Sequence, residues 1–246
     1  MKKQTLIIGL ILLFFINAKA TTWGESKHIC PICKTNNKFQ DIMSYGGYIY
    51  SWPSKYQYVY WPLTDSESVY CCLNCHYSTF MWDFDSIPGN KIESLKLFLE
   101  TVKFDKKYKN YIDIPITTRL EIAGNVYKII GKDSEFWCKF FRVIGYHYDA
   151  EKNTVKAKES RLSSLDLAKK MLADSLYRGQ EKEILYIIAS MHNFIGQKDS
   201  ALLFLEQAKS KTYHNKNWKD KNNKGLNDYL TNTIIEYKDL IKNNSK

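Results

Sequence analysis

Two pairs of cysteines, each with the spacing Cys-x-x-Cys, restrict the fold of this chain more than any other feature. The first pair is Cys30 and Cys33, and the second is Cys72 and Cys75. In such a knuckle a tight backbone turn directs two thiolates at one ion, and two knuckles complete a tetrahedral sulfur site. The sequence therefore predicts that these four cysteines bind one structural metal ion, and zinc is the metal that the pattern favours.

The stretch between the two knuckles is longer than the ~15–20 residues of the commonest zinc motif. We therefore expect a β insertion at about 45–61 to loop out between them. Within it, residues 56–60 alternate as a strand would, and residues 68–70 are a second short β candidate. Lys34 and His76 stand where a glycine usually follows the second cysteine of a knuckle.

Three other interpretations of the cysteines stay open. In an oxidising compartment they could form disulfides, with Cys71 paired to Cys138. The string Cys72-Leu73-Asn74-Cys75-His76 is also the attachment motif of c-type haem, with His76 as one axial ligand and Met81 or Met43 opposite it. Either knuckle could instead be a thiol–disulfide redox pair, although neither has an evident thioredoxin-like setting. Haem would leave the first knuckle unexplained, whereas zinc uses both.

No group of residues predicts catalysis. His28 and His76 flank the knuckles, and we expect them to hydrogen-bond ligand sulfurs rather than to bind the metal. Asp83 and Asp85 form a carboxylate pair, but no nucleophile accompanies them, so turn or capping roles are favoured. The many aromatic residues before position 90 could form a recognition surface, but we expect them to be the core of the metal module. The chain is therefore predicted to be non-enzymatic.

The N-terminus has the pattern of a signal peptide. Lys2 and Lys3 precede an apolar run at 6–16, and the small-x-small motif at 18–20 predicts cleavage before Thr21. The run is too short to span a bilayer, which needs ~20 residues, and no later stretch is apolar enough. We therefore expect a periplasmic or secreted protein without a membrane span in the mature chain. The formal net charge is +10, but export argues against nucleic acid as a partner.

After the turn at 87–90 the apolar residues follow a helical period. They predict helices at about 92–102, 119–130, 134–144, 162–177, 181–195, 200–210 and 227–241. Gly145 is expected to end the third of these, and Thr117 or Thr118 to cap the second. The hairpin at 182–215 has the spacing of a tetratricopeptide repeat, with small residues at Ala189, Gly196, Ala201 and Ala208. His192 stands where that repeat usually has an aromatic residue.

Together these patterns predict an α+β fold in three parts: a signal peptide at 1–20, a small β-rich zinc-ribbon-like module with four cysteines at 21–90, and an all-α tetratricopeptide-like region at 91–246. The two knuckles, Tyr70, Tyr77 and the following helices resemble the bacterial proteins grouped as domain of unknown function 2225. The resemblance spans about 27–210 and implies metal-ligand roles for Cys30, Cys33, Cys72 and Cys75.

The leading functional hypothesis is an exported, zinc-stabilised adaptor that binds a protein or peptide partner through its helical repeats. The alternatives from other classes are a haem c electron carrier, using Cys72, Cys75 and His76, and a thiol–disulfide oxidoreductase.

Overall fold

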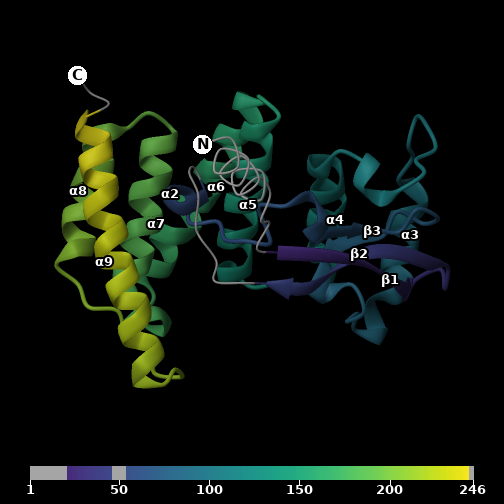
Figure 1. Ribbon diagram of the computed structural model, residues 1–246, viewed down its shortest axis with the longest axis horizontal. Coiled ribbons are helices and arrows are strands. Elements are labelled where there is room, and N and C mark those ends of the chain that lie inside the picture. The colour runs from purple at the N-terminus through teal and green to yellow at the C-terminus, as the bar shows by residue number, and fades with distance from the viewer. Residues whose placement is uncertain (1–20, 46–53, 244–246) are drawn as a thin grey trace, which may run out of the picture.

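A computed structural model describes residues 21–45 and 54–243, so the predicted signal peptide and Trp52 lie outside the described residues. Figure 1 shows an elongated molecule with the strands at one end and helices α7, α8 and α9 at the other. The predicted α+β fold is confirmed. None of the described helices is long and apolar enough to cross a membrane.

The β part consists of two antiparallel hairpins. β1 (Thr21–Ile29) pairs with β2 (Asn36–Tyr45), and β3 (Val69–Cys71) pairs with β4 (Ser78–Phe80). The registers place Ile29 opposite Asn36 and Cys71 opposite Ser78, so each hairpin tip is one Cys-x-x-Cys knuckle. The sequence patterns do not predict the first hairpin, whereas the prediction of a strand near residues 68–70 is confirmed.

The described helices follow in chain order. They are α2 (Ser54–Gln57), α3 (Ile92–Thr101), α4 (Ile116–Ile130), α5 (Ser134–Ala150), α6 (Thr154–Ala173), α7 (Glu181–Phe194), α8 (Lys198–Lys209) and α9 (Asp220–Asn243). α5 packs along α6, α6 along α7, and α7 along α8, so that consecutive helices form an array.

The predicted bounds of several helices are wrong. α4 begins at Ile116 with Pro115 as its N-cap, whose carbonyl oxygen accepts from the Arg119 N–H at 3.1 Å, so the predicted cap at Thr117 or Thr118 is wrong. α5 continues through Gly145 to Ala150. A Cβ at Gly145 would lie 3.3 Å from the Ser160 Cβ and 3.5 Å from the Ala157 carbonyl oxygen, so this glycine allows α5 and α6 to approach closely.

The hairpin of α7 and α8 has the local packing that its small residues predict. Ala189, Ala201 and Ala208 are fully buried, and Gly196 has a φ of 87° at the turn between the helices. His192 is buried and stacks on Phe204, with their ring centroids 5.3 Å apart. His192 therefore packs as the aromatic residue that is usual at this position would. The assignment to tetratricopeptide repeats stays a prediction.

The segment Ser54–Tyr60 does not contain the strand predicted at 56–60. Its first four residues form the short helix α2, which packs against α5, α7 and α9. The Tyr186 hydroxyl donates to the Lys55 carbonyl oxygen at 2.9 Å, and Arg142 Nη1 donates to the Tyr58 carbonyl oxygen at 2.7 Å. The Tyr56 ring lies 4.4 Å from that of Tyr237. The alternating tyrosines are therefore buried against helices rather than in a sheet, and this segment joins the two halves of the molecule.

The buried residues that the structure describes form three clusters, and each combines residues from before and after position 90. One surrounds the knuckles and includes Leu95 and Tyr111. A second joins Val69 and Phe80 to α4 and α5, and the third joins Tyr56 and Tyr58 to α5–α9. The β part and the helices thus share their cores. The division into domains at residue 90 stays a prediction.

His147 on α5 makes the stability of this core depend on pH. It is 4% exposed, its Nε2 lies 2.8 Å from the Leu63 carbonyl oxygen, and burial lowers its pKa from 6.5 to about 4. Between these values the unfolded chain binds a proton that the folded protein excludes, so stability falls as the pH drops. From about pH 7.5 to about pH 5 we expect a loss of about 2 kcal/mol from this residue. Urea unfolding at both pH values measures it.

The control for this prediction is His147→Gln, which keeps a polar side chain but does not titrate. The free-energy difference between wild type and variant should shrink by about 2 kcal/mol on going to the lower pH. A difference that stays constant over this range would contradict the prediction. Because the variant retains the four cysteines, acid effects on those thiols cancel in the comparison.

Candidate metal centre

The four predicted ligands are brought together at one point. The sulfur atoms of Cys30, Cys33, Cys72 and Cys75 all lie within 4.8 Å of one another. The Cys30–Cys75 sulfur distance is 3.5 Å and the Cys33–Cys72 distance is 3.6 Å. A tetrahedral ion with metal–sulfur bonds of about 2.3 Å needs sulfurs about 3.8 Å apart, whereas a disulfide needs about 2.05 Å. The cluster therefore has the size of a metal site.

Both knuckles have the same backbone hydrogen bonds. In the first, the Cys30 N–H donates to Thr35 O and the Lys34 N–H donates to Cys30 O, each at 2.9 Å. In the second, the Cys72 N–H donates to Tyr77 O and the His76 N–H donates to Cys72 O, also at 2.9 Å. The repeated pattern turns two thiols of each hairpin tip to the same side.

Lys34 and His76, which follow the second cysteine of each knuckle, have the backbone conformation that glycine usually supplies there. Lys34 has a φ of 62° and His76 a φ of 63°. This left-handed conformation favours glycine and costs roughly 1–2 kcal/mol for other residues. The fold thus keeps the usual knuckle backbone at two residues that disfavour a positive φ. This indicates that the geometry of the thiols determines the turn.

Four thiols this close cannot all ionise without a cation. Hydrogen bonds from Cys30 and Cys75 lower the pKa of Cys72 to about 2. The hydrogen bond with Cys72 raises the pKa of Cys30 to about 12, and hydrogen bonds to Cys30 and Cys72 raise the pKa of Cys75 far above its usual range. Without a cation, the close packing of the thiols therefore keeps some of them protonated. A dication would displace those protons and bind four thiolates.

The two remaining cysteines lie apart from this cluster and from each other. Cys71 is buried, its sulfur faces the carbonyl oxygens of Cys72 and His76 at 3.9 and 3.8 Å, and burial raises its pKa to about 12. The Cys138 sulfur lies 3.7 Å from the Ser164 carbonyl oxygen on α6, within another core. Both thiols are free, so the alternative of a Cys71–Cys138 disulfide is wrong for this structure.

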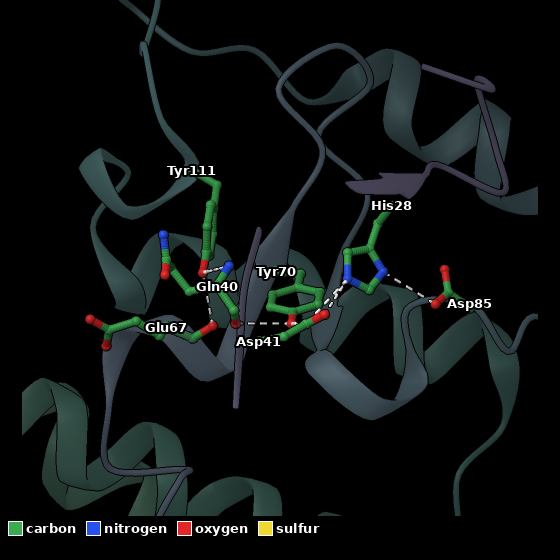
Figure 2. A network of polar contacts seen from close by, with 7 residues as sticks. All are labelled: His28, Gln40, Asp41, Glu67, Tyr70, Asp85 and Tyr111. Atoms are coloured by element: carbon green, nitrogen blue, oxygen red, sulfur yellow. Dashed lines mark hydrogen bonds and ion pairs between the residues drawn. The ribbon is translucent and has the colours of Figure 1, made fainter. Parts of the chain in front are cut away.

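The prediction that the two flanking histidines hydrogen-bond the ligand sulfurs is wrong. His76 Nδ1 lies 3.3 Å from the Val102 carbonyl oxygen, and its ring packs on Phe104. Figure 2 shows the His28 ring between two carboxylates, with Nε2 3.1 Å from Asp41 and Nδ1 3.3 Å from Asp85. His28 therefore ties the strand before Cys30 to β2 and to the loop that carries Asp85.

Asp41 is the centre of this polar network, and the sequence alone gives no signal for it. Burial opposes ionisation of Asp41, but hydrogen bonds from Tyr70, Ser26 and His28 outweigh it and lower its pKa. The Tyr70 hydroxyl also donates to the Gln40 carbonyl oxygen at 3.0 Å, and the Tyr111 hydroxyl donates to the Glu67 carbonyl oxygen (Figure 2). The network therefore joins the strands that precede the two knuckles.

Asp41→Asn should cost about 1–3 kcal/mol of unfolding free energy, because the amide cannot accept from Tyr70 and His28 as the carboxylate does. Urea unfolding of the metal-loaded protein measures this cost. The matched control is Asp85→Asn, since Asp85 is 63% exposed and contacts the same histidine. That change should cost less than about 1 kcal/mol. Equal costs for the two variants would contradict the central role of Asp41.

The strand before the second knuckle is also fixed by a buried arginine. Arg119 on α4 is fully buried. Its Nε donates to the Ile114 carbonyl oxygen at 3.0 Å, and its Nη1 donates to the carbonyl oxygens of Ser66 and Val69. Burial lowers its pKa to about 10. Because Val69 begins β3, this side chain connects the metal centre to the helical part.

The other predicted positions have structural roles. The Asp83 carboxylate accepts from the Tyr127 hydroxyl at 2.7 Å and lies 3.5 Å from Lys132. Of the aromatic residues before position 90, Tyr56, Tyr58, Tyr77, Phe80 and Phe84 are buried, whereas Trp82 is 59% exposed. The five buried residues are core residues, as predicted, but of these Tyr77 and Phe84 belong to the cluster around the knuckles, whereas Tyr56, Tyr58 and Phe80 pack against helices.

These observations define the class of this molecule as an α+β protein whose two hairpin knuckles form a four-cysteine cluster. The model of one family, described as "Uncharacterized protein conserved in bacteria (DUF2225)", matches residues 24–230. The chain belongs to this family, as the resemblance predicted. No curated protein and no solved structure matches the chain. The matched range contains both knuckles and α2–α8.

Proposed function

We propose that this chain is an exported, non-enzymatic protein whose fold is stabilised by one zinc ion on Cys30, Cys33, Cys72 and Cys75. The convergence of the four sulfurs supports this proposal most directly. Four sulfur ligands fill a tetrahedral zinc site, whereas catalytic zinc keeps one position open for water or substrate. The bound ion would offset part of the thiolate charge and hold the two hairpins together.

The alternatives have less support in the geometry. The closest sulfurs belong to different knuckles, and a dithiol redox pair would instead use the two cysteines of one Cys-x-x-Cys. Neither knuckle lies at a helix N-terminus, where a redox thiol is usually activated. Haem attached at Cys72 and Cys75 would need His76 as an axial ligand, but that ring is engaged by Val102 and Phe104.

The metal content of protein exported into a periplasm and purified without added metal tests the zinc assignment. We expect one zinc per chain, retained in Cys71→Ser and lost in Cys72→Ser. These two positions are adjacent and both buried, so they are a matched pair. A haem absorption band, or a metal-free protein with oxidised thiols, would contradict the proposal. The intact mass of the same sample should correspond to a chain that begins at Thr21.

The helical part is proposed to bind a protein or peptide partner. The face of α5, α7 and α9 that contacts Ser54–Tyr60 is already occupied by this segment of the chain. We therefore assign the partner to the outer helices, where Leu162, Leu203 and Ile235 are exposed apolar residues on α6, α8 and α9. Stacked helices commonly present extended interaction surfaces.

Photo-crosslinking in the envelope tests this role. A photoreactive residue at position 203 or 235 should yield a discrete adduct of one mass. The same residue at position 158 on α6, where Lys158 is an exposed charged side chain, is the control and should give none. Absence of adducts at both apolar positions, or identical adducts at all three, would contradict an adaptor role for these helices.

A further inference from the structure

A cavity of about 400 Å³ lies between α5 and α7, beside the segment that occupies the inner face of the helices. Residues of four elements line it: Arg142 of α5, Glu183 and Ile187 of α7, Met171 of α6, and Tyr58. The volume is within the range of small-molecule sites, which are about 300–1,000 Å³. The cavity is remote from the cysteine cluster in sequence, and its lining includes no ligand of that cluster.

The positive side of the cavity is on α5. Arg142 is 6% exposed, and its Nε and Nη1 donate to the carbonyl oxygens of Cys138 and Tyr58 at 3.2 and 2.7 Å. These partners are neutral, so they orient the guanidinium without cancelling its charge. Lys139 lies three residues earlier on the same helix and also lines the cavity. Burial, and then the charge of Arg142, lower the pKa of Lys139. An anion here would relieve both effects.

The negative charge of the cavity comes from Glu183 on α7 and from Asp133 and Glu135 at the start of α5. Burial raises the pKa of Glu183, although the hydroxyl groups of Tyr58 and Tyr213 and the charge of Arg142 oppose the shift. Among the residues that the structure describes, no salt bridge joins Glu183 to Lys139 or Arg142. Arg142 is buried, Glu183 is half-buried and Lys139 is exposed at the cavity wall. Opposite charges therefore face one cavity from two helices, and a ligand with both charges would find a partner for each of its charged groups.

We propose that this cavity is a binding site for a free α-amino acid with an apolar side chain. The α-carboxylate would contact Lys139 and Arg142, and the α-ammonium group would contact Glu183. The apolar side chain would pack against Met171, Ile184 and Ile187, which line the same cavity. A nucleotide or other polyanion fits less well, because Asp133, Glu135 and Glu183 all contribute negative charge to the lining.

Isothermal titration of the proteinogenic amino acids into the metal-loaded protein tests this site. We expect leucine, isoleucine or methionine to bind with 1:1 stoichiometry. N-acetyl-leucine lacks the ammonium group and leucinamide lacks the carboxylate, and each should bind at least about tenfold more weakly than leucine. Equal binding of leucine and either derivative would overturn the proposal. Absence of binding by every amino acid at about 10 mM would also overturn it.

Two variants test whether the amino acid binds in this cavity. Glu183→Gln is nearly isosteric, and Lys139→Met alters a side chain that is exposed at the cavity wall, so neither requires the fold to change. Each should weaken leucine binding at least about tenfold. Lys158→Met on α6 is the matched control and should bind as wild type. Wild-type binding by both cavity variants would overturn the assignment. The titration does not depend on the zinc or partner proposals, because both variants retain the cysteines and the outer helices.

Discussion

Replacing Cys72 by serine is expected to release the metal and to unfold the region around both hairpins. Cys72 is fully buried, and its sulfur lies 3.6 Å from that of Cys33 in the opposite knuckle. Structural zinc sites contribute on the order of 10 kcal/mol of folding free energy, which is comparable with the whole stability of a domain. Circular dichroism and metal analysis of the same sample measure both effects.

Cys71→Ser is the control for this prediction, because Cys71 precedes Cys72, is equally buried and is not part of the cluster. A hydroxyl in its place still faces the carbonyl oxygens of Cys72 and His76, so the cost should be no more than about 1–2 kcal/mol. The metal should be retained. If Cys72→Ser kept its metal and its cooperative melting, the four-cysteine centre would not be what stabilises this fold.

The second large effect is expected for Arg119→Met. Methionine has a similar length but donates no hydrogen bond, so the carbonyl oxygens of Ile114, Ser66 and Val69 lose their partner in a buried site. Each unsatisfied buried group costs roughly 1–3 kcal/mol, and the variant should lose about 3–5 kcal/mol in all. Urea unfolding with tryptophan fluorescence measures the loss.

The matched control is Arg178→Met, since Arg178 is exposed in the turn before α7. This substitution also replaces a guanidinium by a thioether, but at the surface. It should alter the unfolding free energy by less than about 0.5 kcal/mol. Arg119→Lys distinguishes charge from geometry: a single ammonium cannot reach all three carbonyl oxygens, so it should recover only part of the loss. A cost for Arg119→Met below about 1 kcal/mol would contradict the role given to this side chain.

The four-cysteine cluster could be predicted because its information is local. Each knuckle is a turn of a few residues, and the spacing of two cysteines determines where both thiols point. The same holds for α3, α7 and α8, where apolar residues at helical spacing and a turn glycine such as Gly196 identify each element. The family resemblance implied the same ligand roles for the four cysteines.

The features that could not be predicted depend on distant residues. Residues 56–60 alternate like a strand, but their tyrosines are buried by Tyr186 and Tyr237, which lie far along the chain. Gly145 is of a residue type that often ends a helix, yet a Cβ there would lie 3.3 Å from the Ser160 Cβ, so glycine favours the close approach of α5 and α6. Asp41 and Arg119 are single polar residues whose partners become evident only when four separate segments meet.

The segment Ser54–Tyr60 also has a consequence for the order in which the chain can assemble. Lys55 pairs with Glu236, 181 positions later, so a ribosome must synthesise nearly the entire chain before this contact can form. The tyrosines of the segment remain without their final surroundings until α9 is complete, and contacts at such separation slow folding. A chain truncated before α9 should therefore expose Tyr56 and Tyr58 and be prone to aggregation, even with an intact set of cysteines.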